Sequence, residues 1–242
     1  MSGALDIAGV SKRFRGLLAV DNVSFRVEPG AIFAVIGPNG AGKTTLFNII
    51  AGNLVPSQGA ITFDGARIDG LAPDEVCRRG IGRTFQLVRP FPTLSVEDNV
   101  VIGALLHRGD PVMARRRAHE VLWQIDLFDK RHQLASALTL PDRKRLEVAR
   151  ALATDPKLLL LDEVMAGLRP AETDRMVAIL TKLNRETGMT ILLIEHVMRA
   201  VMALAARVLV LHHGAAIAEG APEAVVREPA VVESYLGAEA VE

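Results

Sequence analysis

Several residue types are scarce in this chain of 242 residues, and each scarcity excludes a class of protein. The single cysteine, Cys77, cannot form an internal disulfide, which fits a reducing compartment such as the cytosol. Lys and Arg number 28, as do Asp and Glu, so the basic excess typical of nucleic-acid binding is missing. Aromatic residues make up 4% of the chain but hydrophobic residues 50%, which predicts an aliphatic core. No apolar run approaches the roughly 20 residues of a membrane-spanning helix.

One glycine-rich stretch has the pattern of a phosphate-binding loop, G-x-x-x-x-G-K-[ST]. The unbroken apolar run before it, residues 31–36, predicts a buried parallel strand, and the residues from Leu46 onward predict the first turns of a helix. Backbone N–H groups that converge at a helix N-terminus hold a triphosphate well. The pattern therefore predicts a nucleotide site formed by Gly37, Pro38, Asn39, Gly40, Ala41, Gly42, Lys43, Thr44 and Thr45.

Within this loop, each residue type suits one part of a bound triphosphate. Gly40 and Gly42 stand where the backbone must turn sharply and approach the ligand. Lys43 supplies positive charge to the β- and γ-phosphates, and the hydroxyl of Thr44 is suited to ligate Mg²⁺. Thr45 can donate a hydrogen bond to the α-phosphate.

Two further apolar strands end in polar side chains that suit the same chemistry. Leu158–Leu161 predicts a buried strand that delivers Asp162 and Glu163 at its carboxyl end, where ligands lie in doubly wound sheets. Asp162 is then the expected Mg²⁺ partner, and Glu163 is placed to orient or deprotonate the attacking water. Residues 189–194 predict the neighbouring strand, and His196 after it is either a polar strand cap or a contact of the γ-phosphate.

The remaining segments predict two additions to this parallel core. Alternating residues at 5–10 and 23–27 predict a small antiparallel layer, and Phe14 between them is either a half-exposed core residue or a platform for a nucleobase. Helical spacing at 96–106, 114–127 and 143–153 predicts a helical insertion over about 87–155. The arginines at 115–117 there form either a solvated helix face or a contact with lipid or a partner.

Taken in order, these motifs resemble the ATP-binding cassettes of ABC transporters, over essentially the whole chain. The resemblance implies an α/β fold: a P-loop NTPase (RecA-like) core with an antiparallel β subdomain and an inserted helical subdomain. It predicts one domain, 1–242, with the core and antiparallel layer at 1–86 and 156–219, the helical subdomain at 87–155 and a helical extension at 220–242. Finer stretches at 11–14, 83–86, 166–168 and 220–237 are similar to the ATPase subunits of branched-chain amino-acid importers.

The resemblance also implies roles for individual residues. Phe14 stacks on the adenine of ATP, and Gln86 joins Thr44 and Asp162 at Mg²⁺. Glu163 is the catalytic carboxylate, assisted by Lys43, and His196 senses the γ-phosphate. Such cassettes act as dimers on transmembrane permease subunits, at the cytoplasmic face of the plasma membrane. A solute-binding protein takes part indirectly, and no nucleic acid is expected.

One stretch departs from the family pattern. The signature motif, Leu-Ser-Gly-Gly-Gln, faces the ATP of the partner subunit, and here it is replaced by Leu138, Thr139, Leu140, Pro141 and Asp142, with a helix expected from Arg143. Pro141 has no N–H to donate, Thr139 and Asp142 fit a capping box, and Asp142 is expected to place negative charge where phosphate docks. Arg169 also stands where the family's dimer-contact loop has Asp. We therefore expect a heterodimer with one working and one weak site.

Two other functions remain open at this stage. A soluble cassette ATPase of translation or DNA repair is less well supported, because such chains generally carry two cassettes or a long coiled coil. A non-catalytic nucleotide-binding subunit is supported by the altered signature and opposed by Glu163. The sequence does not identify the transported solute or decide between homodimer and heterodimer.

Overall fold

The computed structural model describes residues 3–84 and 90–239, and it places the phosphate-loop strand inside a mainly parallel sheet. In that part of the chain the sheet has six strands in the order β10-β9-β3-β8-β7-β6. The strands β3, β6, β7, β8 and β9 run parallel, and β10 closes one edge antiparallel to β9. Their bounds are β3 Ile32–Ile36, β6 Ile81–Arg83, β7 Leu158–Asp162, β8 Thr190–Ile194, β9 Arg207–His212 and β10 Ala215–Gly220.

The register of the central strands brings their carboxyl ends to one edge. Val35 of β3 pairs with Ile194 of β8, and Ile194 pairs with Asp162 of β7. Every residue of β3, β7 and β8 is buried, as expected for strands covered on both faces. The phosphate loop, the two carboxylates after β7 and the polar residues after β8 therefore leave the sheet side by side.

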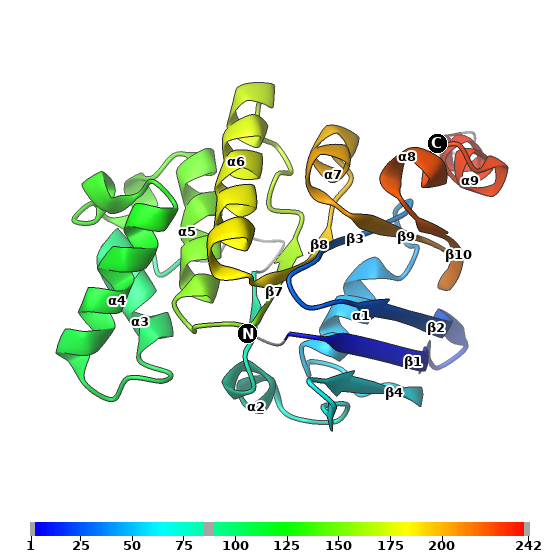
Figure 1. The fold of residues 1–242 in the computed structure, drawn as a ribbon, viewed down its shortest axis with the longest axis horizontal. Coiled ribbons are helices and arrows are strands. Elements are labelled where there is room, and N and C mark those ends of the chain that lie inside the picture. The colour runs from blue at the N-terminus through cyan, green and yellow to red at the C-terminus, as the bar shows by residue number, and fades with distance from the viewer. Residues whose placement is uncertain (1–2, 85–89, 240–242) are drawn as a thin grey trace.

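A second sheet of four antiparallel strands lies beside the first, in the order β2-β1-β4-β5 (Figure 1). It is formed by β1 Leu5–Phe14, β2 Leu17–Val27, β4 Gln58–Phe63 and β5 Ala66–Arg67. Helix α1, Lys43–Ile50, lies between the two sheets, and the apolar side chains of both sheets and of α1 form one hydrophobic cluster. This confirms the predicted antiparallel layer.

Helix α1 begins three residues earlier than the sequence predicted. The prediction placed its first turn at Leu46, whereas the helix begins at Lys43, after Gly42 in a left-handed conformation with φ 99°. A left-handed residue lets the loop turn directly into the helix, and glycine adopts that conformation without the steric cost of a side chain. As a result Lys43, Thr44 and Thr45 form the first turn, with their backbone N–H groups at the helix N-terminus.

The predicted helical stretch between β6 and β7 contains three α-helices that lie together at the side of the molecule away from α8 (Figure 1). A second large hydrophobic cluster joins these helices to α6, α7 and the other face of the parallel sheet. The elements not yet named are α2 Pro73–Arg78, α3 Val96–Ala104, α4 Pro111–Gln124, the 3₁₀ turns η1 Phe128–Lys130 and η2 Ala135–Ala137, α5 Leu140–Leu152, α6 Pro170–Thr187, α7 Met198–Leu204, α8 Pro222–Val225 and α9 Pro229–Glu239.

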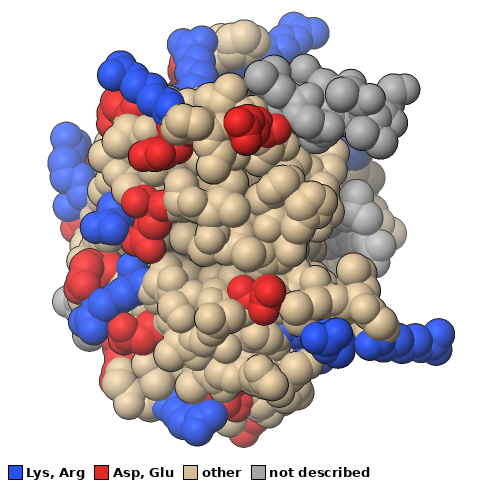
Figure 2. Space-filling model, turned by 90° about the vertical axis from the view of Figure 1, so that its right-hand side faces the viewer, with Lys and Arg blue, Asp and Glu red and all other residues tan. Residues whose placement is uncertain are grey.

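Among the described residues, both signs of charge occur on the face beside the β1–β2 hairpin and β10. Figure 2 shows that charged side chains of both signs lie mostly along one margin of this face, and few lie in its middle. Within residues 3–84 and 90–239, none of the helices combines the length and hydropathy that crossing a bilayer requires.

The junction of β3 with the phosphate loop generates a first prediction. A Cβ at Gly37 would overlap the backbone carbonyl oxygen of Leu211, whereas a Cβ at Gly40 meets no atom within 4 Å. Both glycines have positive φ, so an alanine at either position costs about 1–2 kcal/mol in backbone strain. Gly37→Ala should cost distinctly more than Gly40→Ala, because β9 must also move away from β3. Urea unfolding of the two variants measures the difference, and equal costs would contradict this packing.

Candidate active site

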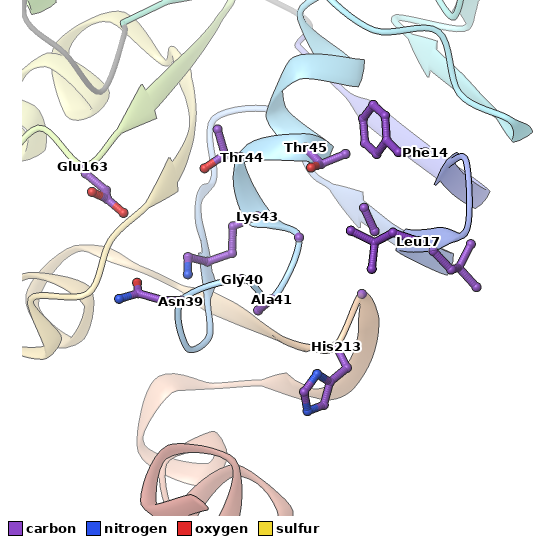
Figure 3. A pocket seen from close by; sticks show the side chains of 14 residues that line it. Phe14, Leu17, Asn39, Gly40, Ala41, Lys43, Thr44, Thr45, Glu163 and His213 are labelled. Atoms are coloured by element: carbon purple, nitrogen blue, oxygen red, sulfur yellow. The ribbon is translucent and has the colours of Figure 1, made fainter. Parts of the chain in front are cut away.

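A cavity of about 570 Å³ opens beside the phosphate loop. Its walls come from the β1–β2 hairpin, the loop and first turn of α1, the residue after β7 and the β9–β10 turn. Figure 3 shows Lys43 reaching toward the side where Asn39 and Glu163 lie, with Phe14 and Leu17 on the opposite side. The lining residues are Phe14, Leu17, Leu18, Ala19, Asn39, Gly40, Ala41, Gly42, Lys43, Thr44, Thr45, Glu163, His213 and Gly214.

The amino group of Lys43 is held by the loop itself. Its Nζ donates to the carbonyl oxygens of Gly37, at 2.7 Å, and Pro38, at 2.9 Å. Burial lowers the pKa of Lys43, and the nearby carboxylates of Glu163 and Asp162 oppose that shift. Lys43 is therefore a buried cation whose present partners are neutral carbonyl groups, which an anionic ligand can replace with a stronger, charge-assisted hydrogen bond.

Two hairpin turns pack closely against the phosphate loop. The N–H of Gly214 donates to the carbonyl of Ala41 at 3.1 Å, and the N–H of Asp21 donates to the carbonyl of Gly214 at 2.8 Å. A Cβ at Gly42 would overlap the carbonyl oxygen of Ala19, so only glycine allows this approach. These contacts hold segments that are far apart in sequence around one cavity.

Phe14 lies at the rim of the cavity, at the end of β1. Its side chain is 41% exposed, and the ammonium of Lys12 lies 5.3 Å from the ring centroid. Leu17, which pairs with Phe14 across the hairpin, is 66% exposed. An exposed ring beside an exposed apolar side chain leaves an apolar surface on which a planar ligand can stack.

Asp162 is buried at the end of β7, with one oxygen paired and one free. Its Oδ2 accepts from Arg83 at 3.1 Å, and Arg83 also donates to Asn48. Among the residues that the structure describes, the Oδ1 atom has no hydrogen-bond partner. Burial raises the pKa of Asp162, and the hydrogen bond and charge of Arg83 offset only part of that rise. A buried carboxylate oxygen without a partner is costly unless it meets a ligand, so Asp162 fits a metal-binding role.

Glu163 lies half-buried on the cavity wall, in an unusual backbone conformation. Its φ is 50°, in the left-handed region that non-glycine residues seldom adopt, and its N–H donates to the carbonyl of Ile194 at 3.0 Å. Backbone strain of this kind persists only where the surroundings enforce it, and it is frequent at active sites. His196 is exposed after β8 and does not line the cavity. Gln86 lies outside the described residues.

The stretch at 138–142 differs from its predicted form in two respects. Helix α5 begins at Leu140 and not at Arg143, so Pro141 occupies the first turn, where a helix has no internal use for its N–H. The predicted capping box is also wrong, because the hydroxyl of Thr139 donates to Asp142 Oδ2 at 2.8 Å and caps no backbone N–H.

Asp142 is neutralised inside the protein, contrary to the expectation that its charge would face a phosphate. Asp142 is 2% exposed and forms ion pairs with Lys130 and Arg145. These two cations stabilise the buried carboxylate in place of the backbone N–H groups at the start of α5. Burial alone would raise the pKa of Asp142. The hydrogen bonds from Lys130 and Thr139, together with the charges of Arg145 and Lys130, outweigh burial and lower it.

Leu140 remains exposed at this surface, by 46%, and its Cδ2 lies 3.4 Å from where a Cβ of Gly167 would stand. Both departures from the family pattern, at 138–142 and at 166–169, therefore adjoin one another. Arg169 precedes α6, and its N–H donates to Glu172 at 2.8 Å.

Sequence reasoning missed five residues of the cavity wall. Leu17, Leu18 and Ala19 lie at the start of β2, and His213 and Gly214 form the β9–β10 turn, so they reach the cavity only through tertiary packing. No local sequence pattern marks these residues as part of a cavity. The missed residues are Leu17, Leu18, Ala19, His213 and Gly214.

Comparison with known proteins gives full-length matches. Residues 20–166 match the family model described as ABC transporter, and residues 217–241 match the model described as branched-chain amino acid ATP-binding cassette transporter. The chain is 38% identical to the high-affinity branched-chain amino acid transport ATP-binding protein BraF of Pseudomonas aeruginosa, over 96% of this chain and 97% of that one. The same figures hold for LivG of Escherichia coli.

Solved structures agree in fold. The ADP conformation of MJ1267, an ATP-binding cassette of an ABC transporter, has a TM-score of 0.89 at 31% identity and covers 98% of this chain and 100% of that one. A dimeric post-hydrolysis state of the cassette MJ0796, bound to ADP and Pi, has a TM-score of 0.82 at 26% identity and covers 90% of this chain and 98% of that one.

The buried ion pairs of Asp142 generate the second prediction. Because its pKa is lowered in the folded protein, the charged form stabilises the fold above the usual pKa near 3.9, and that contribution is lost as the pH falls through the lowered value. Asp142→Asn should therefore cost about 3 kcal/mol at neutral pH, and the difference from the wild type should shrink below about pH 4.

Asp174→Asn is the matched control, since Asp174 pairs with Arg199 at an exposed site and should contribute less than about 1 kcal/mol. Urea unfolding at several pH values measures both variants. A cost for Asp142→Asn that equals that of Asp174→Asn, or that is independent of pH, would contradict the buried network.

Proposed function

Because the chain belongs to the ABC transporter family of ATP-binding cassettes, we propose that it is the ATP-hydrolysing subunit of an importer for branched-chain or related amino acids. The full-length relatives that bear this name, and the match of residues 217–241, support the choice of solute class. The observation that carries the proposal is that Lys43, Thr44 and Glu163 line one cavity.

ATP binds in this proposal with its phosphates along residues 37–45. Lys43 exchanges the carbonyl oxygens of Gly37 and Pro38 for oxygens of the β- and γ-phosphates, and the N–H groups of the first turn of α1 donate to phosphate. Phe14 stacks on adenine beside the exposed side chain of Leu17.

Mg²⁺ is the metal ion expected to accompany the nucleotide. The hydroxyl of Thr44 lies in the first turn of α1, and Asp162 offers a buried Oδ1 that has no hydrogen-bond partner within residues 3–84 and 90–239. Both groups fit the preference of Mg²⁺ for oxygen ligands. Gln86 is the third proposed ligand. When bound, Mg²⁺ neutralises negative charge on the β- and γ-phosphate oxygens.

Glu163 is the proposed general base. Its carboxylate accepts a proton from the attacking water, whose oxygen bonds to the γ-phosphorus as the bond to the bridging oxygen breaks, which leaves ADP and phosphate. Lys43 stabilises the charge that develops on the phosphate oxygens. His196 is proposed to contact the γ-phosphate, for which its exposed side chain must turn toward the cavity.

The proposed partners follow from the family. A second ATPase subunit completes the dimer, transmembrane permease subunits form the path, and a solute-binding protein delivers the amino acid. The chain then sits on the inner face of the plasma membrane, in the cytoplasm. The dimeric state of a relative supports the pairing of cassettes.

Lys43 and Glu163 serve different steps, which gives the third prediction. Lys43→Ala should weaken ATP binding by about tenfold or more, because it removes a charge-assisted hydrogen bond of roughly 1.5–3 kcal/mol. Glu163→Gln should bind ATP as the wild type does and lose at least about a hundredfold in turnover, since the amide cannot accept the proton. Both variants should abolish uptake of labelled leucine by cells.

Nucleotide affinity and phosphate release, measured on the purified complex, separate the two effects. Turnover at the wild-type rate in Glu163→Gln would show that the base has been misassigned. Wild-type leucine uptake in both variants would contradict the importer role.

We propose further that the partner is a different cassette with an intact signature. The charge of Asp142 no longer supports this proposal, because Asp142 is buried and paired with Lys130 and Arg145. Two features still support it: Pro141 has no N–H, and the side chain of Leu140 is exposed. These residues stand where the family's signature motif has two glycines, whose backbone can approach the phosphates of the partner's ATP. A homodimer would meet this surface at both sites, whereas a heterodimer would meet it at one.

The fourth prediction is therefore an asymmetric pair. The tagged chain, purified from its host, should bring down a second cassette in equal amount, as measured by mass spectrometry. Glu163→Gln should abolish most ATPase activity of this complex, and removal of the partner's catalytic carboxylate should abolish less. A complex that contains only this cassette, or full activity after Glu163→Gln, would overturn the heterodimer.

A further inference from the structure

Two buried ionisable side chains contact the backbone of residues 163–165 and do not line the cavity. Lys144, on α5, is 5% exposed, and Glu195, which directly follows β8, is 1% exposed. Lysine and glutamate are almost never fully buried unless they are paired or perform a task. Neither residue belongs to the phosphate loop or to the predicted metal ligands.

Both side chains bind the backbone of the segment that carries Glu163. The Nζ of Lys144 donates to the carbonyl oxygen of Glu163 at 2.9 Å. Two residues further on, the N–H of Met165 donates to Oε1 of Glu195, also at 2.9 Å. The segment 163–165 is thus held at one end by a cation from α5 and at the other by an anion from the end of β8.

The charge of Glu195 also acts on Lys144. Burial lowers the pKa of Lys144, and among the neighbouring charges that oppose this, the carboxylate of Glu195 acts most strongly, ahead of Glu163 and Asp162. Burial raises the pKa of Glu195, and the N–H of Met165 and the charge of His196 offset only part of that rise. Among the described residues, its Oε2 atom has no hydrogen-bond partner.

Glu163 needs such support because of its backbone. A non-glycine residue with φ near 50° costs about 1–2 kcal/mol, and the segment would relax to a commoner conformation without outside contacts. Relaxation at φ would swing the carboxylate away from the cavity. A displacement of about 1 Å at a reacting group is enough to slow a reaction by about a hundredfold.

We propose that Lys144 and Glu195 are positioning residues that fix the backbone of residues 163–165 and so aim the Glu163 carboxylate at the attacking water. The inference rests on the proposed role of Glu163 as the base. Lys144 shares helix α5 with Leu140, Pro141 and Asp142, so the helix that meets the partner subunit's ATP also holds the catalytic segment of this subunit.

The test compares substitutions in the assembled complex purified from its host. Lys144→Met keeps the length of the side chain and removes its donors, and it should lower kcat about tenfold or more while the Kd for ATP stays within about twofold. Lys182→Met is the control, because Lys182 is exposed on α6, and it should leave both constants unchanged. Lys144→Gln, which keeps an N–H donor without the charge, should recover part of kcat.

A double-mutant cycle tests whether the two side chains act together. Glu195→Leu removes the acceptor of the Met165 N–H and should also lower kcat, and the pair Lys144→Met with Glu195→Leu should lose less than the product of the two single losses. If Lys144→Met is too unstable to purify, Lys144→Gln and Glu195→Gln are assayed in its place, with thermal unfolding measured on each.

Three results would overturn the inference: wild-type kcat in Lys144→Met, equal losses in kcat and ATP affinity, or no rescue by Lys144→Gln in a folded protein. Glu163→Gln, measured in parallel, separates the premise from the inference. Wild-type turnover in Glu163→Gln would refute the assignment of Glu163 as the base, which is the premise. If Glu163→Gln is inactive and Lys144→Met is fully active, only the positioning role is refuted.

Discussion

The parallel register of β3, β8 and β7 is the constraint on which the rest of the site depends. Because Val35, Ile194 and Asp162 lie in one row across the sheet, three strands end together. The phosphate loop follows the first, Glu195 follows the second and Glu163 follows the third. A slip of one residue in any pair would turn the next side chain to the opposite face of the sheet and separate the cation of the loop from the carboxylates that it faces.

Helix α5 contacts the site from a second direction, through the residues of its first two turns. Its first turn is the surface proposed to face a partner subunit, where Asp142 is held by Lys130 and Arg145, and its next turn carries Lys144 against the carbonyl of Glu163. One helix would therefore touch both the proposed dimer surface and the segment that carries the proposed base. Pro141, which has no N–H, and the exposed side chain of Leu140 stand in that first turn, where the family has two glycines, and they are the physical basis for proposing unequal sites in the dimer.

The sequence predicted the parts of the structure that depend on local patterns. The buried strands β3, β7 and β8 are continuous apolar runs. The phosphate loop is recognised by the fixed spacing of its glycines, lysine and threonine. The sequence predicted the starts of α1 and α5 three residues too late, because Lys43 and Asp142 are polar and their burial follows from tertiary contacts. Lys130 is twelve residues from Asp142, and the carbonyl that Lys144 binds is nineteen residues away, so no local pattern could reveal these pairs. The cavity wall at Leu17 and His213 was missed for the same reason.

The central claim is that ATP lies along residues 37–45 with Glu163 at its γ-phosphate. An experimental structure of the assembled complex, trapped with Mg²⁺ and ATP in the Glu163→Gln variant, tests it most directly. We expect the Nζ of Lys43 to have left the carbonyl oxygens of Gly37 and Pro38 for the β- and γ-phosphates, adenine to lie on Phe14, and residue 163 to stand one water molecule from the γ-phosphorus. Triphosphate bound elsewhere, or residue 163 turned away from it while Lys43 keeps its present partners, would contradict the account.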